Sequence, residues 1–159
     1  MRINQAVLSF LVANPFGWLA DWAGGIPLIV VIVLFHVLGL GLIRQMALRV
    51  SGGIMERHHP TYVFVIVMGA ATLFATTLHG LEAMIWAAAY TALGALPSFK
   101  TATLYSLNAM TSLGHDTQVL EERWRLMGAI EALNGVLLFG LSTAFLFGMI
   151  ARVWKLDSK

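Results

Sequence analysis

Three long apolar runs constrain this chain more than any other feature of its sequence. The first, residues 26–43, reads IPLIVVIVLFHVLGLGLI and is interrupted only by His36. A helix of this length covers about 27 Å, close to the hydrocarbon thickness of a bilayer. Two more apolar runs occupy residues 61–93 and 124–153. We therefore predict an all-α transmembrane protein with spans at about 26–46, 61–93 and 124–153.

The composition supports this class. Hydrophobic residues make up 58% of the chain and charged residues only 11%, whereas soluble domains carry about 25% charged residues. A soluble fold of this composition would lack the polar groups to cover its surface. The absence of cysteine excludes disulfides and thiolate metal sites, and a net charge of +2 is too small to indicate nucleic-acid binding. The length indicates one domain.

Two segments outside these runs need a different interpretation. In residues 1–25, Pro15 and Gly17 interrupt the apolar stretch, and Trp18 and Trp22 favour an N-terminal segment at the membrane interface. Residues 26–159 then form a single transmembrane domain. Residues 99–112, FKTATLYSLNAMTS, read as a short helix that Ser98 can cap. At about 20 Å this helix cannot cross a bilayer, so it is re-entrant, interfacial or extramembrane.

Lysine and arginine set the expected orientation. Six of them lie in the loop 44–61 and the C-terminal tail, against four on the opposite side. By the positive-inside rule the first group is cytoplasmic, which places the N-terminus outside and the C-terminus inside. We expect a multi-pass protein of the inner (cell) membrane.

Ionisable and polar residues inside the spans are the first candidates for function. His79 and Glu82 lie in the second span, and Glu131 and Asn134 in the third. Each pair is spaced i, i+3, so its members share a helix face. Such residues are costly in lipid and usually face the protein interior. They indicate either an ion pathway or a network that supports one, although backbone hydrogen bonding and helix packing are an equally good explanation.

For the two carboxylates we expect contact with the short helix or the loop after it, or with each other through a shared proton. A metal site built from His79, Glu82 and Glu131, with or without His115, is a weaker alternative, because no HExxH or paired ExxH motif supports it. We assign no metal ligand and no cofactor. His36 stands alone in the first span and reads as a packing residue. A stripe of small residues along the third span permits close helix approach: Gly128, Ala132, Gly135 and Ser142.

The stretch ATLYSLNAMTSLGHDTQVLEERWR, residues 102–125, resembles the pore region of potassium channels. That family has a short pore helix, a Thr-Thr-Val/Leu-Gly-Tyr-Gly-Asp filter, and an outer loop leading into the lining helix. Thr111, Ser112, Leu113 and Gly114 fall on Thr-Thr-Leu-Gly, and His115, Asp116 and Thr117 fall on Tyr-Gly-Asp. From His79 onward the chain looks like small bacterial proteins of the ion-channel or two-pore-domain type.

The resemblance implies a pore helix at about 99–112 and a filter-like loop at 111–117. It also implies a homotetramer, since one chain supplies one filter segment, with the third span lining the axis. The ion-binding residues would be Thr111, Ser112, Leu113, Gly114, His115 and Asp116, supported by His79, Glu82, Glu131 and Asn134. Asp116 replaces the second filter glycine, where left-handed backbone is needed. Selectivity for potassium over sodium should therefore be weak or altered.

We accordingly expect a tetrameric cation channel in which monovalent ions such as potassium occupy the pore. The alternative is a channel-derived membrane protein that does not conduct and has a structural, sensory or metal-binding role. An enzyme or carrier is not expected, because the sequence shows neither a catalytic constellation nor an internal repeat. The expected partners are lipid and further copies of the chain, with no nucleic acid and no soluble protein.

Overall fold

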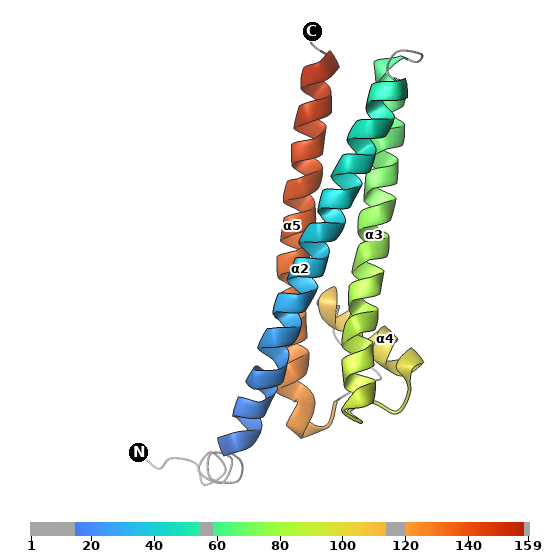
Figure 1. The fold of residues 1–159 in the computed structure, drawn as a ribbon. Coiled ribbons are helices and arrows are strands. Elements are labelled where there is room, and N and C mark those ends of the chain that lie inside the picture. Colours follow the sequence, from blue (N-terminus) through green and yellow to red (C-terminus); the bar gives the residue numbers. More distant parts are fainter. Residues whose placement is uncertain (1–14, 55–58, 114–119, 158–159) are drawn as a thin grey trace.

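The computed structural model describes residues 15–54, 59–113 and 120–157, and these residues form an all-helical structure. Three long helices, α2 (Pro15–Ile54), α3 (Pro60–Ala92) and α5 (Arg125–Asp157), run side by side (Figure 1). A short helix, α4 (Phe99–Met110), lies at one end of the bundle, and a single 3₁₀ turn, η1 (Glu122–Trp124), leads into α5. The C-terminal end of α5 lies at the other end, away from α4.

All three long helices are apolar enough and long enough to span a membrane. The candidate spans are Asp21–Val50, Thr61–Ala92 and Glu122–Ala151. The prediction of an all-α protein with three helices able to span a membrane is thus confirmed for the described residues, at the level of length and composition. Helices α3 and α5 begin within one residue of the predicted starts at 61 and 124, because the apolar runs alone mark them.

The first helix differs from the prediction at its start. It begins at Pro15 rather than near residue 26, and it continues through Pro27 to Ile54. Proline is well tolerated at the first helical position, where its missing N–H has no partner to lose. Pro15 therefore starts the helix instead of breaking it, and residues 15–25 belong to the same helix as the first span. Residues 1–14 of the expected interfacial segment lie outside the described part.

The short helix α4 has a defined start and a defined end. The side chain of Ser98 accepts a hydrogen bond of 3.2 Å from the Thr101 N–H, which confirms the predicted cap. At the other end, Leu113 N–H donates to Asn108 O and Ser112 N–H donates to Ala109 O, at 3.2 and 3.0 Å. This pattern is a Schellman turn, and it places Ser112 in the left-handed region with φ 56°.

The C-terminal end of α3 closes with the same turn. Ala95 N–H donates to Tyr90 O and Gly94 N–H to Thr91 O, at 2.9 and 3.1 Å. Gly94 takes the left-handed conformation, with φ 67°. The chain then turns through Pro97 into α4, which therefore starts at the end of the bundle where α3 finishes (Figure 1).

From there α4 packs its buried face on α3 and α5. That face consists of residues spaced by three and four: Ala102, Tyr105, Ser106, Ala109 and Met110. The last of these meets α5 backbone to backbone, because a Cβ added at Gly135 would overlap the main chain of Met110. Gly135 lies near the middle of the candidate span Glu122–Ala151, about 20 Å from its start. The end of α4 thus reaches the middle of the third span.

The main core of the bundle surrounds this contact. Its fully buried aromatic side chains, Trp86 and Tyr90 of α3, lie near Tyr105 of α4, whose ring meets Tyr90 edge to face at 5.4 Å. Two smaller apolar clusters, one around Leu40 and Leu78 and one around Val63 and Met149, hold the remaining length of the long helices together.

Candidate functional site

Four polar side chains from all three long helices meet inside the bundle, and we call them the histidine cluster. They are His36 of α2, His79 and Glu82 of α3, and Ser142 of α5. His79 and Glu82 share a face of α3 because they are three residues apart. His36 lies close to the midpoint of its candidate span, the part of a spanning helix where ionisable groups are most costly.

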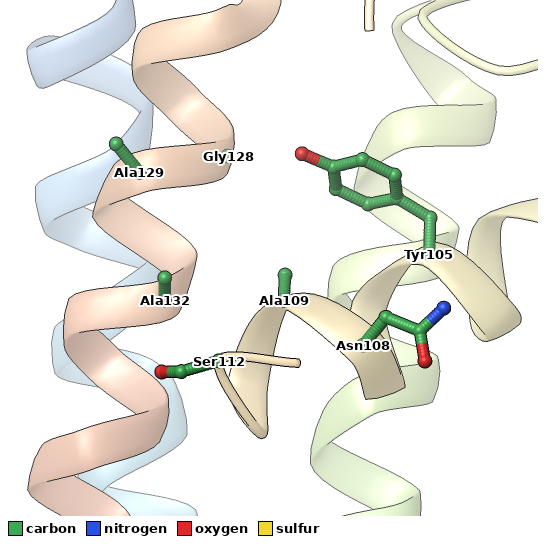
Figure 2. Close-up of a pocket in the computed structure, with 7 residues that line it drawn as sticks. All are labelled: Tyr105, Asn108, Ala109, Ser112, Gly128, Ala129 and Ala132. Atoms are coloured by element: carbon green, nitrogen blue, oxygen red, sulfur yellow. The ribbon is translucent and has the colours of Figure 1, made fainter. Parts of the chain in front are cut away.

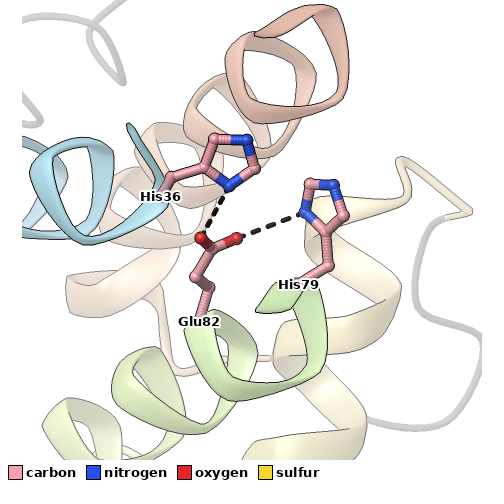
Figure 3. Close-up of side chains that lie close together, drawn as sticks. All are labelled: His36, His79 and Glu82. Carbon is pink, nitrogen blue, oxygen red and sulfur yellow. Dashed lines mark hydrogen bonds and ion pairs between the residues drawn. The ribbon is translucent and has the colours of Figure 1, made fainter. Parts of the chain in front are cut away.

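The carboxylate of Glu82 lies between the two imidazole rings. Its Oε1 is 2.7 Å from His36 Nδ1, and its Oε2 is 3.2 Å from His79 Nδ1 (Figure 3). His36 and Glu82 are fully buried, and the His79 side chain is 13% exposed. Both rings therefore face the Glu82 carboxylate with their Nδ1 atoms, His36 from α2 and His79 from α3.

Ser142 closes the cluster on the opposite side of the rings. Its Oγ is 3.0 Å from His79 Nε2 and 3.2 Å from His36 Nε2. Phe139, one turn earlier on α5, stacks on the His79 ring at 4.5 Å between centroids. The two imidazoles are thus held between a carboxylate and a hydroxyl, with an aromatic ring against one of them.

The number of protons on the two rings decides which contacts of the histidine cluster are hydrogen bonds. An ionised Glu82 accepts from the Nδ1–H of His36 and faces His79 Nδ1 at 3.2 Å without full hydrogen-bond geometry, which leaves both Nε2 atoms directed at Ser142. One hydroxyl can donate to only one of them. Both contacts of Ser142 are hydrogen bonds when the other histidine carries a second proton and donates it to Ser142 Oγ. In that state the carboxylate and the imidazolium cancel, so the cluster is neutral inside the bundle.

A second group of buried polar side chains lies beside α4, and we call it the Glu131 cluster. The Tyr90 hydroxyl donates a hydrogen bond of 2.8 Å to Glu131 Oε2. Ser106 of α4 contacts the same carboxylate without full hydrogen-bond geometry, and Asn134 is fully buried one turn further along α5. Glu131 Oε1 and both amide atoms of Asn134 have no protein hydrogen-bond partner among the described residues.

An open cavity separates part of α4 from α5. It has a volume of about 350 Å³ and is lined by Tyr105, Asn108, Ala109 and Ser112 on one side and by Gly128, Ala129 and Ala132 on the other (Figure 2). Tyr105 reaches across it toward Gly128, where an added Cβ would overlap the hydroxyl oxygen. Burial, and to a lesser degree the charge of Glu131, raises the pKa of Tyr105 to about 12.

Only part of the filter-like loop falls within the described residues. Thr111 is the C-cap of α4, and its hydroxyl bonds Leu107 O at 2.8 Å. Ser112 holds the left-handed turn, and Leu113 is 80% exposed. Gly114, His115 and Asp116 lie outside the described part. The assignment of these six residues as an ion-binding filter stays a prediction.

The structure brings together some of the predicted support residues and separates others. His79 contacts Glu82, and Glu131 shares a cluster with Asn134 near α4. The idea that the two carboxylates hydrogen-bond each other is wrong, because Glu82 pairs with the histidines while Glu131 pairs with Tyr90. Counting along single helices fixes depth and face, but it does not fix which helix supplies the partner.

Sequence reasoning missed two members of the histidine cluster. His36 was expected to stand alone, and Ser142 was assigned to a stripe of small packing residues, yet both belong to the cluster. The available signal was depth: His36 and Ser142 both lie within about two turns of the midpoints of their spans, as does His79.

These features define an all-helical protein whose three long apolar helices fit a multi-pass membrane protein, with two buried polar clusters between the helices. Searches of protein-family models, curated proteins and solved structures found no match to this chain.

Proposed function

We propose that this chain is a potassium-channel-like membrane protein whose copies assemble, as a homotetramer, around a cation pathway. The observation that carries the proposal is the placement of α4. This helix starts at the end of the bundle and stops against Gly135, in the middle of the third span. A helix too short to cross a bilayer, with its end beside the middle of a candidate span, supports the role of a pore helix that enters from one side.

The electrostatics of α4 agree with this role. The C-terminal end of a helix carries the negative end of its macrodipole. The last turn of α4 holds no basic residue that would neutralise it. A negative helix end at mid-membrane depth favours a cation there, and the potassium-channel-like segment Thr111–Asp116 follows directly in the sequence.

The unburied surface of α5 supports assembly. Leu133, Val136 and Leu137 are at least half exposed in the single chain, and small residues line the cavity next to α4. In a membrane such a surface contacts lipid or another copy, and small residues let helices approach closely. One α4 per chain requires several chains to surround a pathway.

The alternative function is a channel-derived protein that does not conduct and instead holds an ion or proton within the bundle. The specific observation behind it is the histidine cluster, which is complete within one chain. The two functions differ in whether ions cross the membrane.

Reconstitution into liposomes tests the proposal. Potassium and sodium gradients are applied to vesicles holding the native protein, and to vesicles holding the double variant His115→Tyr, Asp116→Gly, which restores the filter pattern. We expect cation flux from the native protein with weak discrimination between the two ions. Flux only in the double variant would mean that the native chain is a disabled pore. No flux from either, with intact tetramers by native mass measurement, would contradict the channel proposal.

A further inference from the structure

We propose that the histidine cluster is a membrane-embedded binding site for a divalent transition-metal ion of the zinc type. The ligands are the imidazoles of His36 and His79, whose Nδ1 atoms face Glu82, and the Glu82 carboxylate. These three donor groups all lie within 4.8 Å of one another. This site is separate from α4 and the filter-like loop, and its occupation does not depend on whether the chain conducts ions.

The ligand set matches the chemistry of this class of metal. Two imidazole nitrogens and one carboxylate suit Zn²⁺ and its first-row neighbours, whereas Ca²⁺ and Mg²⁺ prefer sites made only of oxygen. Three protein ligands leave a fourth position of a tetrahedral ion open for water. The partly exposed edge of the cluster, at His79, is where that ligand would enter.

Two distances between the imidazoles and the carboxylate approach those of a metal site, each measured to a different oxygen of Glu82. A tetrahedral Zn²⁺ with bonds of about 2.0 Å keeps its donor atoms about 3.3 Å apart. The His79 to Glu82 separation, 3.2 Å, has this length. The His36 to Glu82 separation is 2.7 Å, so the ion requires about half an ångström of widening.

The position of Ser142 supports the metal site most strongly, because Ser142 can hydrogen-bond the ring nitrogens that do not bind the metal. Metal-ligating histidines usually donate their other ring N–H to an oxygen, which fixes tautomer and orientation. When both Nδ1 atoms bind a metal, both Nε2 atoms carry hydrogen and donate. Ser142 Oγ lies 3.0 and 3.2 Å from these two atoms and can accept from both. One residue thus orients both ligands.

Charge also favours occupation by a cation. Glu82 is fully buried at membrane depth, where an isolated carboxylate is costly. The cluster contains no lysine or arginine. Among the described residues, the only ion-pair partners of Glu82 are the two histidines. A bound divalent ion supplies the positive charge and lets both histidines stay neutral.

The test uses the full chain in detergent or nanodiscs, with any affinity tag removed and metal stripped by a chelator. Co²⁺ is titrated as a probe, since tetrahedral Co²⁺ absorbs visible light strongly, and bound Zn²⁺ is counted by elemental mass spectrometry after dialysis. We expect about one ion per chain, and higher thermal stability with Zn²⁺ than without it. Glu82→Gln and His36→Asn should abolish binding, and Ser142→Ala should weaken it about 10- to 100-fold.

Two variants serve as matched controls. Glu131→Gln removes another fully buried carboxylate, and His59→Asn removes an exposed histidine at the start of α3. Both should bind metal as the native chain does, and circular dichroism and size-exclusion chromatography establish that each variant folds. A folded native chain that neither gives the Co²⁺ spectrum nor retains Zn²⁺ would overturn the proposal in favour of a cluster that holds only protons. Undiminished binding by folded Glu82→Gln would overturn it too.

Discussion

Gly135 of α5 lies against the main chain of Met110, so closely that no side chain fits between the two helices. This contact sets where α4 ends along α5. Replacing Gly135 by Ala should therefore push α4 away from α5 and lower the stability by about 1–3 kcal/mol, the usual cost of overpacking. Thermal unfolding in a mild detergent, followed by the helical circular-dichroism signal, measures the change.

Gly140 gives a matched control on the same helix, since nothing lies within 4 Å of a Cβ added there. Gly140→Ala should be neutral or slightly stabilising, because alanine favours helix over glycine. Equal melting temperatures for the two variants would show that the contact at Gly135 does not hold α4.

The hydrogen bond from Tyr90 to Glu131 leads to a second prediction. Tyr90→Phe removes the donor and leaves a buried carboxylate oxygen unpaired, which should cost about 1–3 kcal/mol. Adding Glu131→Leu to this variant should cost much less than it does in the native chain, since the stranded carboxylate is then gone. A double-mutant cycle of unfolding free energies measures the coupling, and strict additivity of the two changes would contradict it.

Ser112 and Gly94 occupy the same position in two Schellman turns, but only one of them is glycine. Ser112→Gly should stabilise the chain by about 0.5–1 kcal/mol, because a left-handed residue with a side chain is strained. Thr111→Gly, one residue earlier in right-handed backbone, should instead destabilise by about 0.3 kcal/mol. The melting temperatures of the two variants should move in opposite directions, and a shift of the same sign would exclude a left-handed Ser112.

The raised pKa of Tyr105 predicts an alkaline loss of stability. An unfolded tyrosine loses its proton near pH 10, whereas burial keeps Tyr105 protonated up to a pKa of about 12. Between these values the unfolded chain binds fewer protons than the folded one, so stability falls as pH rises. Below pH 10 Tyr105 is protonated in both the folded and the unfolded chain, so it does not make the stability depend on pH.

Comparison with Tyr105→Phe isolates this effect. The difference in phenolate absorbance between the native chain and the variant should stay small at pH 11 while the protein is folded. The variant should also lose less stability between pH 10 and 12. A Tyr105 that ionises near pH 10 in the folded protein would show that the hydroxyl is not buried against Gly128.

The helices could be predicted because each depends on a contiguous feature of the sequence. Apolar runs mark α3 and α5, and Pro97-Ser98 marks the start of α4. Pro15 was misjudged because the same residue can end one helix or begin another, and the neighbouring sequence does not distinguish these outcomes.

The clusters were harder to predict because their members come from different helices. The i, i+3 spacing places His79 beside Glu82, but nothing in a single helix indicates that His36 approaches the same carboxylate. Ser142 resembles its small neighbours in size, so its polar role becomes evident only when both histidine rings are placed next to it.

The histidine cluster also has a consequence for how the chain is made. During synthesis α2 reaches the membrane first, then α3, and α5 only after α4 has emerged. Once α3 has entered, Glu82 can already pair with His36, so the nascent hairpin does not have to leave a lone carboxylate facing lipid. Ser142 and Glu131 arrive last and complete both polar clusters. A chain released before α5 would lack the partners that α5 provides for the Nε2 atoms of both rings and for the hydroxyl of Tyr90. Such an incomplete chain therefore differs from the finished one in its unpaired polar groups.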